Sequence, residues 1–245
     1  MAQQSFARYE LKYLITAEQR DRILTEIEPQ MIPDKYGRST VRNLYFDTPT
    51  YRLIRRSMEK PTYKEKLRLR SYTRASEDSP VFAEIKKKYK KRVYKRRVSV
   101  KEGEAMAWFS GESEPSVQGQ VVREIDYFLS FYGEMRPSLY LAYDREAYYS
   151  RTDDSFRITF DDRILFRQEE LTLDSEPYGT SILEEGKVLM EIKCGGGVPL
   201  WMTDILSRER IFRTSFSKYG TAYANYIFPS CRKEINDGSI ISGTF

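Results

Sequence analysis

The segment YKEKLRLRSY, residues 63–72, alternates cations with apolar residues. Leu67 and Leu69 fall between cations that occupy every second position: Lys64, Lys66, Arg68 and Arg70. Successive side chains of a β-strand point to opposite faces of its sheet. The pattern therefore predicts a strand with one cationic face and one partly apolar face.

Three further segments alternate in the same way. Their ionic sets are Arg8/Glu10/Lys12, Glu84/Lys86/Lys88 and Glu191/Lys193. The charged faces could simply meet water while the apolar faces cover a core. Helical patterns between the strands favour a second arrangement, because an amphipathic helix must lie on an apolar face. In that arrangement the sheet closes into a barrel with an ionic interior, and helices cover its outside.

The organisation of the chain indicates one domain. We find neither a long linker nor a repeat of fixed period, so residues 1–245 are expected to form a single unit. Its core would span about residues 6–226, followed by a C-terminal tail at 227–245. Residues 16–31 predict a helix with Thr16 as its N-cap.

The composition restricts the chemistry. The 245 residues include no histidine and two cysteines. A Ser-His-Asp triad, a His general base and a His-ligated or structural zinc site are thereby excluded. The carboxylates, Lys, Arg, Tyr and Ser that remain suit hard cations and phosphate. No apolar run is long enough for a membrane span, and residues 1–13 lack the apolar core of a signal peptide, so we expect a cytoplasmic protein.

The charge is distributed unevenly along the chain. Residues 1–100 hold 25 Lys and Arg against 12 Asp and Glu, whereas residues 101–245 hold 16 against 24. The basic half could bind a polyphosphate, a nucleic acid or a membrane surface. A charged barrel interior is costly unless a ligand neutralises it, so a cationic interior with a few Glu implies a polyanion and a metal cation held by carboxylates.

Eight motifs in order resemble one known family. They are RYELKY (8–13), LYFDT (44–48), KLRLRSY (66–72), FAEIKKK (82–88), YLAYDREAY (140–148), RITFD (157–161), VLMEIKC (188–194) and SFSKYG (215–220). They are similar to the catalytic domain of the vacuolar transporter chaperone (VTC) complex, a polyphosphate polymerase domain. That domain belongs to the triphosphate tunnel metalloenzyme, or CYTH-like, superfamily. The resemblance spans about residues 6–226.

The resemblance implies a fold and an activity. The fold would be α+β, an antiparallel eight-stranded closed tunnel barrel with a basic, Glu-containing lumen and helices packed outside. The activity would be that of a phosphotransferase, which moves the γ-phosphoryl group of ATP to a growing polyphosphate chain with Mn²⁺ or Mg²⁺. ATP and polyphosphate would be its partners, without a specific nucleic acid. A membrane protein that receives the product is a further partner by family analogy.

The resemblance also implies roles for individual residues. The catalytic set is Lys12, Arg68, Arg70, Lys86 and Lys193. Phosphate or nucleotide would be bound by Lys95, Tyr143, Arg145, Arg157, Ser217 and Lys218. Glu191 would hold the metal, with Glu84 and Glu10 as further candidates that could instead pair with a neighbouring cation.

One departure from the superfamily bears on the reaction. Its hydrolases begin with Glu-x-Glu-x-Lys, whereas this chain has Arg8-x-Glu10-x-Lys12. A cation thus replaces a potential metal ligand or water-activating base, which favours the polymerase over a triphosphatase or tripolyphosphatase. Two non-enzymatic alternatives stay open: a polyphosphate or nucleotide sensor, and an RNA-binding module that uses the basic run 86–97.

Overall fold

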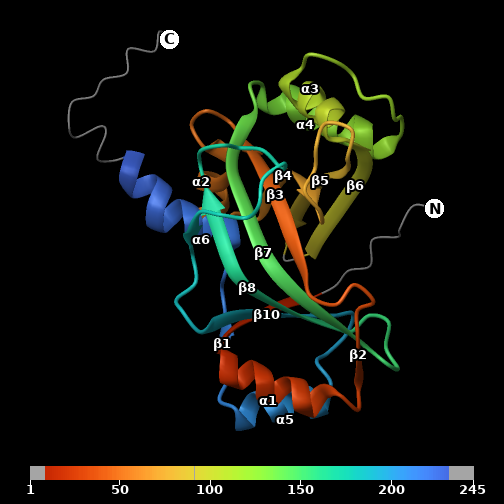
Figure 1. The fold of residues 1–245 in the computed structure, drawn as a ribbon, viewed down its shortest axis with the longest axis vertical. Coiled ribbons are helices and arrows are strands. Elements are labelled where there is room, and N and C mark those ends of the chain that lie inside the picture. Colours follow the sequence, from red (N-terminus) through yellow and green to blue (C-terminus); the bar gives the residue numbers. More distant parts are fainter. Residues whose placement is uncertain (1–8, 91, 232–245) are drawn as a thin grey trace.

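The computed structural model describes residues 9–90 and 92–231, and Figure 1 shows them as an antiparallel sheet with helices around it. The strands are β1 (Tyr9–Thr16), β2 (Met31–Pro33), β3 (Ser39–Asp47), β4 (Tyr63–Ser71), β5 (Pro80–Tyr89), β6 (Arg92–Lys101), β7 (Arg136–Ser150), β8 (Arg157–Arg167), β9 (Thr180–Ser181), β10 (Lys187–Cys194) and β11 (Arg213–Thr214). The helices are α1 (Ala17–Ile27), α2 (Arg52–Met58), α3 (Glu102–Ser110), α4 (Gln120–Tyr132), α5 (Leu200–Arg208), α6 (Lys218–Ala222) and a π-helical turn, η1 (Tyr223–Ile227).

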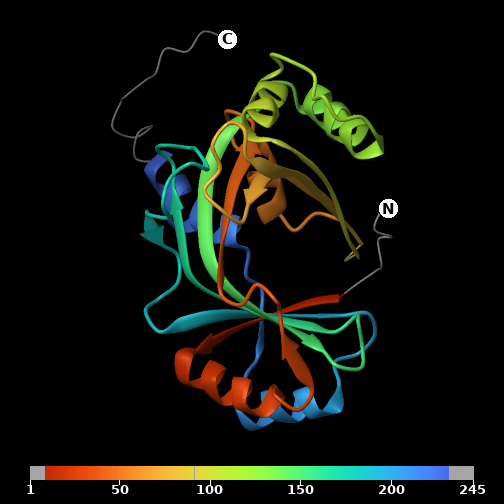
Figure 2. The same cartoon turned by 45° about the vertical axis from the view of Figure 1, so that its right-hand side comes forward.

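The sheet is antiparallel and open, so the closed eight-stranded barrel is a wrong prediction. In the described part of the chain it has 11 strands in the order β11-β1-β10-β8-β7-β3-β4-β5-β6, with β2 on β7 and β9 on β8. Strands β2, β9 and β11 have only two or three residues, too few for a recognisable alternation. The sheet is nevertheless strongly bent, so that β1 and β10 lie across from β5 and β6 (Figure 2).

The apolar faces of the strands lie under helices, as predicted. Ile23 of α1 and Ile205 of α5 pack with Ile158 of β8 and Ile192 of β10 in one buried cluster. Thr16 caps α1: its Oγ1 accepts from the Gln19 backbone N–H at 3.1 Å, and Gln19 Oε1 accepts from the Thr16 N–H at 3.0 Å. This reciprocal pair is a capping box.

A second apolar cluster covers the other end of the sheet. Leu67 and Leu69 of β4 and Ile85 of β5 pack with Trp108 of α3 and Ile125 of α4. These leucines alternate with Arg68 and Arg70, so the two faces of β4 differ as the sequence predicts. The strand is held by its apolar face, which leaves the arginines on the opposite side.

Helix α6 departs from the prediction that helices lie outside. Its Tyr219 and Ala222 pack with Leu141 and Tyr143, which belong to the same face of β7 as the charged residue Arg145. Asp47 fixes this packing, because its carboxylate accepts from the Leu53 and Ile54 N–H groups of α2 and from the Tyr219 hydroxyl at 3.1 Å. The start of α6 is thereby held against the charged face.

None of the helices that the structure describes is long and apolar enough to cross a membrane.

Candidate functional site: the charged inner face

The inner face of the bent sheet gathers ionic residues of seven strands, β1, β4, β5, β6, β7, β8 and β10. Strand pairing sets them opposite one another: Lys12 faces Glu191, Arg68 faces Glu84, and Arg145 faces Asp161. We call this surface the charged face. Its side chains form three groups of ion pairs, each around one carboxylate.

The Glu84 cluster lies at the β4-β5-β6 end. Glu84 is 1% exposed, and its oxygens pair with Arg68 at 2.8 Å and with Lys95 at 2.6 Å. Arg70 lies 3.7 Å from the same carboxylate and donates to Asn43 at 2.9 Å. Burial alone would raise the pKa of Glu84, but these three cations hold it well below its ordinary value.

The Asp161 cluster lies on β7 and β8. Arg145 donates two hydrogen bonds to the fully buried Asp161 carboxylate at 2.6 and 2.7 Å, and Lys218 of α6 donates a third at 2.5 Å. Burial opposes the charge, but the two cations lower the pKa of Asp161 to about 2. Tyr143 lies between the clusters: Arg70 donates to its hydroxyl at 3.2 Å, and Lys218 lies 4.4 Å from its ring.

The Glu191 cluster lies on β1 and β10. Glu191 pairs with Lys193 at 2.8 Å and with Lys12 at 3.6 Å. Burial opposes ionisation of Glu191, but Lys193 and Lys12 hold its pKa well below its ordinary value. Glu10 lies on the same face of β1 as Lys12, and it pairs with Lys86 of β5 at 3.0 Å.

The Glu10–Lys86 pair spans the gap between the two ends of the sheet. The segment after β11 bridges the same gap: Lys12 of β1 donates to the Phe216 carbonyl at 2.9 Å, and Lys66 of β4 donates to Ser217 Oγ at 3.2 Å. Side chains and one loop thus connect strands that no backbone ladder joins. We call this line the seam.

The structure brings most of the predicted site residues together, but not all of them. Thirteen of the fourteen lie in the three clusters, in the Glu10–Lys86 pair, or at Tyr143 and Ser217 beside them. Arg157 of β8 is in register with Lys193, but it belongs to none of these groups: it pairs with Asp34 at 3.7 Å and lies 4.6 Å from the Tyr149 ring. Arg8, on which the contrast with the hydrolases depends, lies outside the described residues.

The basic run 86–97 is divided between the two faces of the sheet. Lys86 and Lys95 belong to the charged face, whereas Lys87 and Arg96 pair with Glu124 of α4 at 3.5 and 3.9 Å. Lys91 lies outside the described residues. The run therefore does not form one continuous cationic surface for RNA.

The charged face also holds residues that were not predicted for the site, among them Lys66, Asn43, Tyr45 and Asp161. Lys66 shares the alternation of Arg68 and Arg70, so the sequence pattern could have found it. Tyr45 accepts a hydrogen bond from Arg68 at 2.9 Å; burial opposes its ionisation, but Arg68, Lys66 and Arg70 lower its pKa to about 8. A phenol shifted in this direction reports a strongly positive local potential.

The pKa values of the lysines shift in the same direction, because a positive potential also favours loss of a proton from an ammonium group. Burial and the arginines nearby lower the pKa of Lys95 to about 7, although Glu84 opposes the shift. Burial likewise lowers the pKa of Lys66 to about 8 and shifts that of Lys12 downward. Cations outnumber carboxylates on this face, which therefore suits a polyanion.

Carboxylates suited to a metal are available but are already paired. No group of three or more Cys, Asp or Glu side chains in the described ranges could hold an ion. Both oxygens of Glu84 contact cations, so its contacts agree with the ion-pair alternative. Glu191 is a better candidate because Thr159, its register partner, has a buried hydroxyl with no hydrogen-bond partner. One carboxylate, a hydroxyl and ligand phosphate oxygens fit Mg²⁺ or Mn²⁺, which seldom need an all-protein cage.

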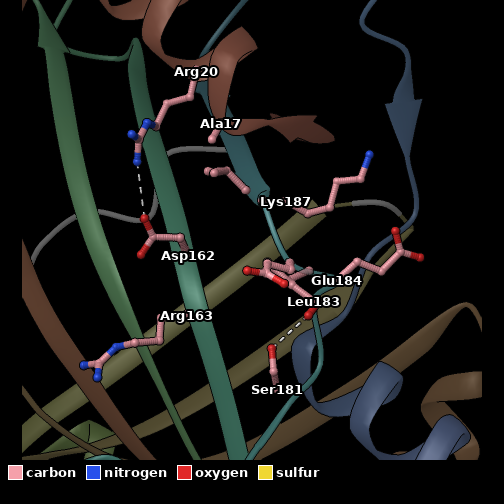
Figure 3. A pocket seen from close by; sticks show the side chains of 11 residues that line it. Ala17, Arg20, Asp162, Arg163, Ser181, Leu183, Glu184 and Lys187 are labelled. Atoms are coloured by element: carbon pink, nitrogen blue, oxygen red, sulfur yellow. Dashed lines mark hydrogen bonds and ion pairs between the residues drawn. The ribbon is translucent and has the colours of Figure 1, made fainter.

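A pocket of about 440 Å³ lies apart from the charged face (Figure 3). Arg20, Asp162, Arg163, Glu184 and Lys187 are among its lining residues. Arg20 and Asp162 are 3.4 Å apart, and Asp162 also accepts from Arg38. None of the predicted site residues lines this pocket.

The bent antiparallel sheet with helices on its outer face and cations on its inner face is consistent with a tunnel fold. Residues 7–227 match the VTC domain family, so the chain belongs to the VTC domain family. A search of curated proteins gives no match.

A solved structure with a TM-score above 0.5 shows the same fold at low identity. A protein of Bacillus halodurans described as a candidate adenylate cyclase is 14% identical, with a TM-score of 0.53 over 86% of this chain and 95% of its own. A protein of Vibrio parahaemolyticus with the same description is 12% identical, with a TM-score of 0.47 over 89% of this chain and 98% of its own.

Proposed function

We propose that this protein is a metal-dependent polyphosphate polymerase, which transfers the γ-phosphoryl group of ATP to the end of a polyphosphate chain. The observation that carries the proposal is the charged face itself. Its three ion-pair clusters hold more cations than carboxylates along one continuous surface. Membership of the VTC domain family supports the same assignment.

The arginines of the charged face suit phosphate recognition. Arg68 and Arg70 lie two residues apart on β4, and their planar guanidinium groups can each hold two phosphate oxygens. Lys12 and Lys193, on the facing part of the sheet, would add point charges along a bound chain. The carboxylates hold these cations, and a bound polyanion would take their place.

The charge state of the carboxylates argues against a hydrolase. Glu84, Asp161 and Glu191 each contact two or more cations, and the pKa of each is lowered. A carboxylate with a lowered pKa is a weak base, so it activates water poorly. Transfer to polyphosphate needs no strong base, because the acceptor phosphate is already ionised.

The proposed reaction forms one P–O bond and breaks another. A terminal oxygen of the chain attacks the γ-phosphorus, and the β–γ bridging oxygen leaves with ADP. Arg68, Arg70 and Lys193 would hold the three phosphates in line and neutralise the charge on the transferred group, which is the main requirement of phosphoryl transfer. A divalent metal held by Glu191 would supply further neutralisation of the phosphate oxygens.

The test is an assay of chain synthesis. Purified protein is incubated with ATP and Mn²⁺, and the products are separated on a gel that resolves polyphosphate lengths. Wild type is compared with Arg70→Ala and Glu191→Gln. Arg96→Ala is the matched control, because Arg96 lies on the outer face and pairs with Glu124 at 3.9 Å. We expect long chains and ADP from wild type and Arg96→Ala, and from neither of the other variants.

Other products would identify the alternatives. Free phosphate without chains would support a triphosphatase and overturn the polymerase. Tight tripolyphosphate binding without turnover, lost in Arg70→Ala, would indicate a sensor. Chain synthesis that survives Arg70→Ala would place the reaction elsewhere.

A further inference from the structure

Lys66 differs from every cation predicted for the site because it has no carboxylate partner in the part of the chain that the structure describes. Every cation predicted for the site lies within 4 Å of a carboxylate; the longest of these separations is the 3.7 Å from Arg70 to Glu84 and from Arg157 to Asp34. Lys66 contacts neutral groups only: it donates to Ser217 Oγ at 3.2 Å and lies 5.5 Å from the Tyr219 ring. Its charge is therefore uncompensated.

Like charges surround this lysine. Burial is the main cause of its lowered pKa, and the charges of Lys12 of β1, Lys64 of β4 and Lys86 of β5 lower the pKa further. Tyr45 is the titratable group that opposes the shift. The position thus combines positive potential with restricted access to water, which favours an anion of high charge.

Two hydroxyl groups beside Lys66 can donate to such an anion. Ser217 Oγ accepts from Lys66 and from the Gly220 N–H at 3.2 Å, so its own hydrogen is free to point to a ligand. The Tyr45 hydroxyl accepts a hydrogen bond from Arg68 at 2.9 Å, so its own hydrogen is also free to point to a ligand. The Tyr45 and Tyr219 rings are 4.9 Å apart, so the hydroxyls and Lys66 belong to one locality.

We propose that Lys66, with Ser217 and Tyr45, binds a terminal phosphate and so distinguishes the end of a phosphate chain from its interior. A terminal phosphate carries a charge of about −1.5 to −2 at neutral pH, because its second pKa is about 6. An interior phosphate carries a single charge. Arginines that are already paired with carboxylates can bind a terminal or an interior phosphate. A lysine without a counterion, beside two neutral hydroxyl donors, binds the more highly charged terminal phosphate more strongly. This specificity role rests on the proposed function.

The experiment measures binding without turnover. Calorimetry in EDTA at pH 7.5 compares tripolyphosphate with its dimethyl ester, in which each terminal phosphate carries a methyl group and a single charge. Wild type should prefer the free-ended ligand. Lys66→Met should reduce that preference about tenfold, because it removes the charge-assisted hydrogen bond to the terminal phosphate. Lys66→Arg should retain most of it.

A matched control lies on the opposite face of the sheet. Lys87 of β5 pairs with Glu124 of α4 at 3.5 Å, so Lys87→Met should bind both ligands as wild type does. ATP in EDTA forms a second arm. A weaker affinity of Lys66→Met for ATP as well as tripolyphosphate assigns the γ-phosphate to this position, and a loss confined to tripolyphosphate assigns the chain end; both support the proposal.

Two results would overturn it: equal weakening of both tripolyphosphate ligands in Lys66→Met, or no change in either. Arg70→Ala separates this question from the proposed function, because it should weaken the free and the methylated ligand alike. If Arg70→Ala binds both as wild type does, the assignment of the charged face fails, whatever Lys66→Met shows.

Discussion

Replacement of Asp161 by Asn tests how the protein's own carboxylates balance the cations of the charged face. Asp161 is fully buried and neutralises Arg145 and Lys218 through hydrogen bonds of 2.5–2.7 Å. The amide keeps the size of the side chain but removes its charge. Two cations then remain in a buried site without a counterion, which destabilises the folded state.

The expected loss follows from two considerations. The pKa of Asp161 falls from 3.8 to about 2 on folding, which corresponds to roughly 2.5 kcal/mol at about 1.36 kcal/mol per unit. Breaking a buried ion pair by removing one partner typically costs about 3–5 kcal/mol. We therefore expect Asp161→Asn to lower the free energy of unfolding by about 3–5 kcal/mol at pH 7. Because the folded pKa is depressed, this stabilisation is complete above pH 4 and is lost as the pH falls through 2.

Urea unfolding measures the loss, and the adjacent residue supplies the control. Asp162 bonds to Arg38, which is 46% exposed, so Asp162→Asn should cost about 1 kcal/mol or less. Saturating tripolyphosphate should raise the free energy of unfolding of Asp161→Asn more than that of wild type, because the ligand supplies the missing negative charge. The reasoning would be refuted if Asp161→Asn lost no more unfolding free energy than Asp162→Asn. It would also be refuted if tripolyphosphate stabilised Asp161→Asn and wild type by the same amount.

Three further predictions concern other parts of the molecule. Asp47→Asn should cost about 1–3 kcal/mol in urea unfolding, because the carboxylate accepts from α2 and from Tyr219; unchanged stability would contradict the capping role. Gly179→Ala should lower the Tm, because φ is +130° and a Cβ would collide with the Phe166 carbonyl; an unchanged Tm in a thermal scan would contradict this. Affinity for ATP in EDTA should fall as pH rises through about 8, where Lys66 loses its proton, and a flat profile by calorimetry would count against its charge.

Much of the fold could be predicted from alternation. The segments 63–72 and 82–88 form strands with the faces that the pattern predicts. When apolar residues and cations alternate, burying the apolar residues in the core places the cations on the opposite face. Closure of the barrel could not be predicted in this way. Whether β6 reaches β1 depends on the bend of the whole sheet, and the pairing of Arg213–Thr214 with Tyr13 leaves no pattern in so short a strand.

Alternation also predicts which residues of the candidate site share a face, but it does not predict which cation pairs with which carboxylate. Alternation places Arg68, Arg70 and Glu84 on one face. It cannot show that Glu84 pairs with Lys95, or that Lys218 reaches Asp161 from a different element. That second contact depends on α6, which is held against the charged face by Asp47 of β3. The same alternation includes Lys66, but it cannot show that Lys66 lacks a carboxylate partner in the described structure.

The strand order also has a consequence for how the chain is made. Strands β4, β5 and β6 follow one another and can pair within microseconds as hairpins, soon after they leave the ribosome. The first strand must wait, because Tyr9 of β1 pairs with Cys194 of β10. Until β10 has been synthesised, β1 is an unpaired edge that can pair with another chain. The seam forms later still, when Phe216 and Ser217 arrive, so the polyanion site is among the last parts of the nascent protein to assemble.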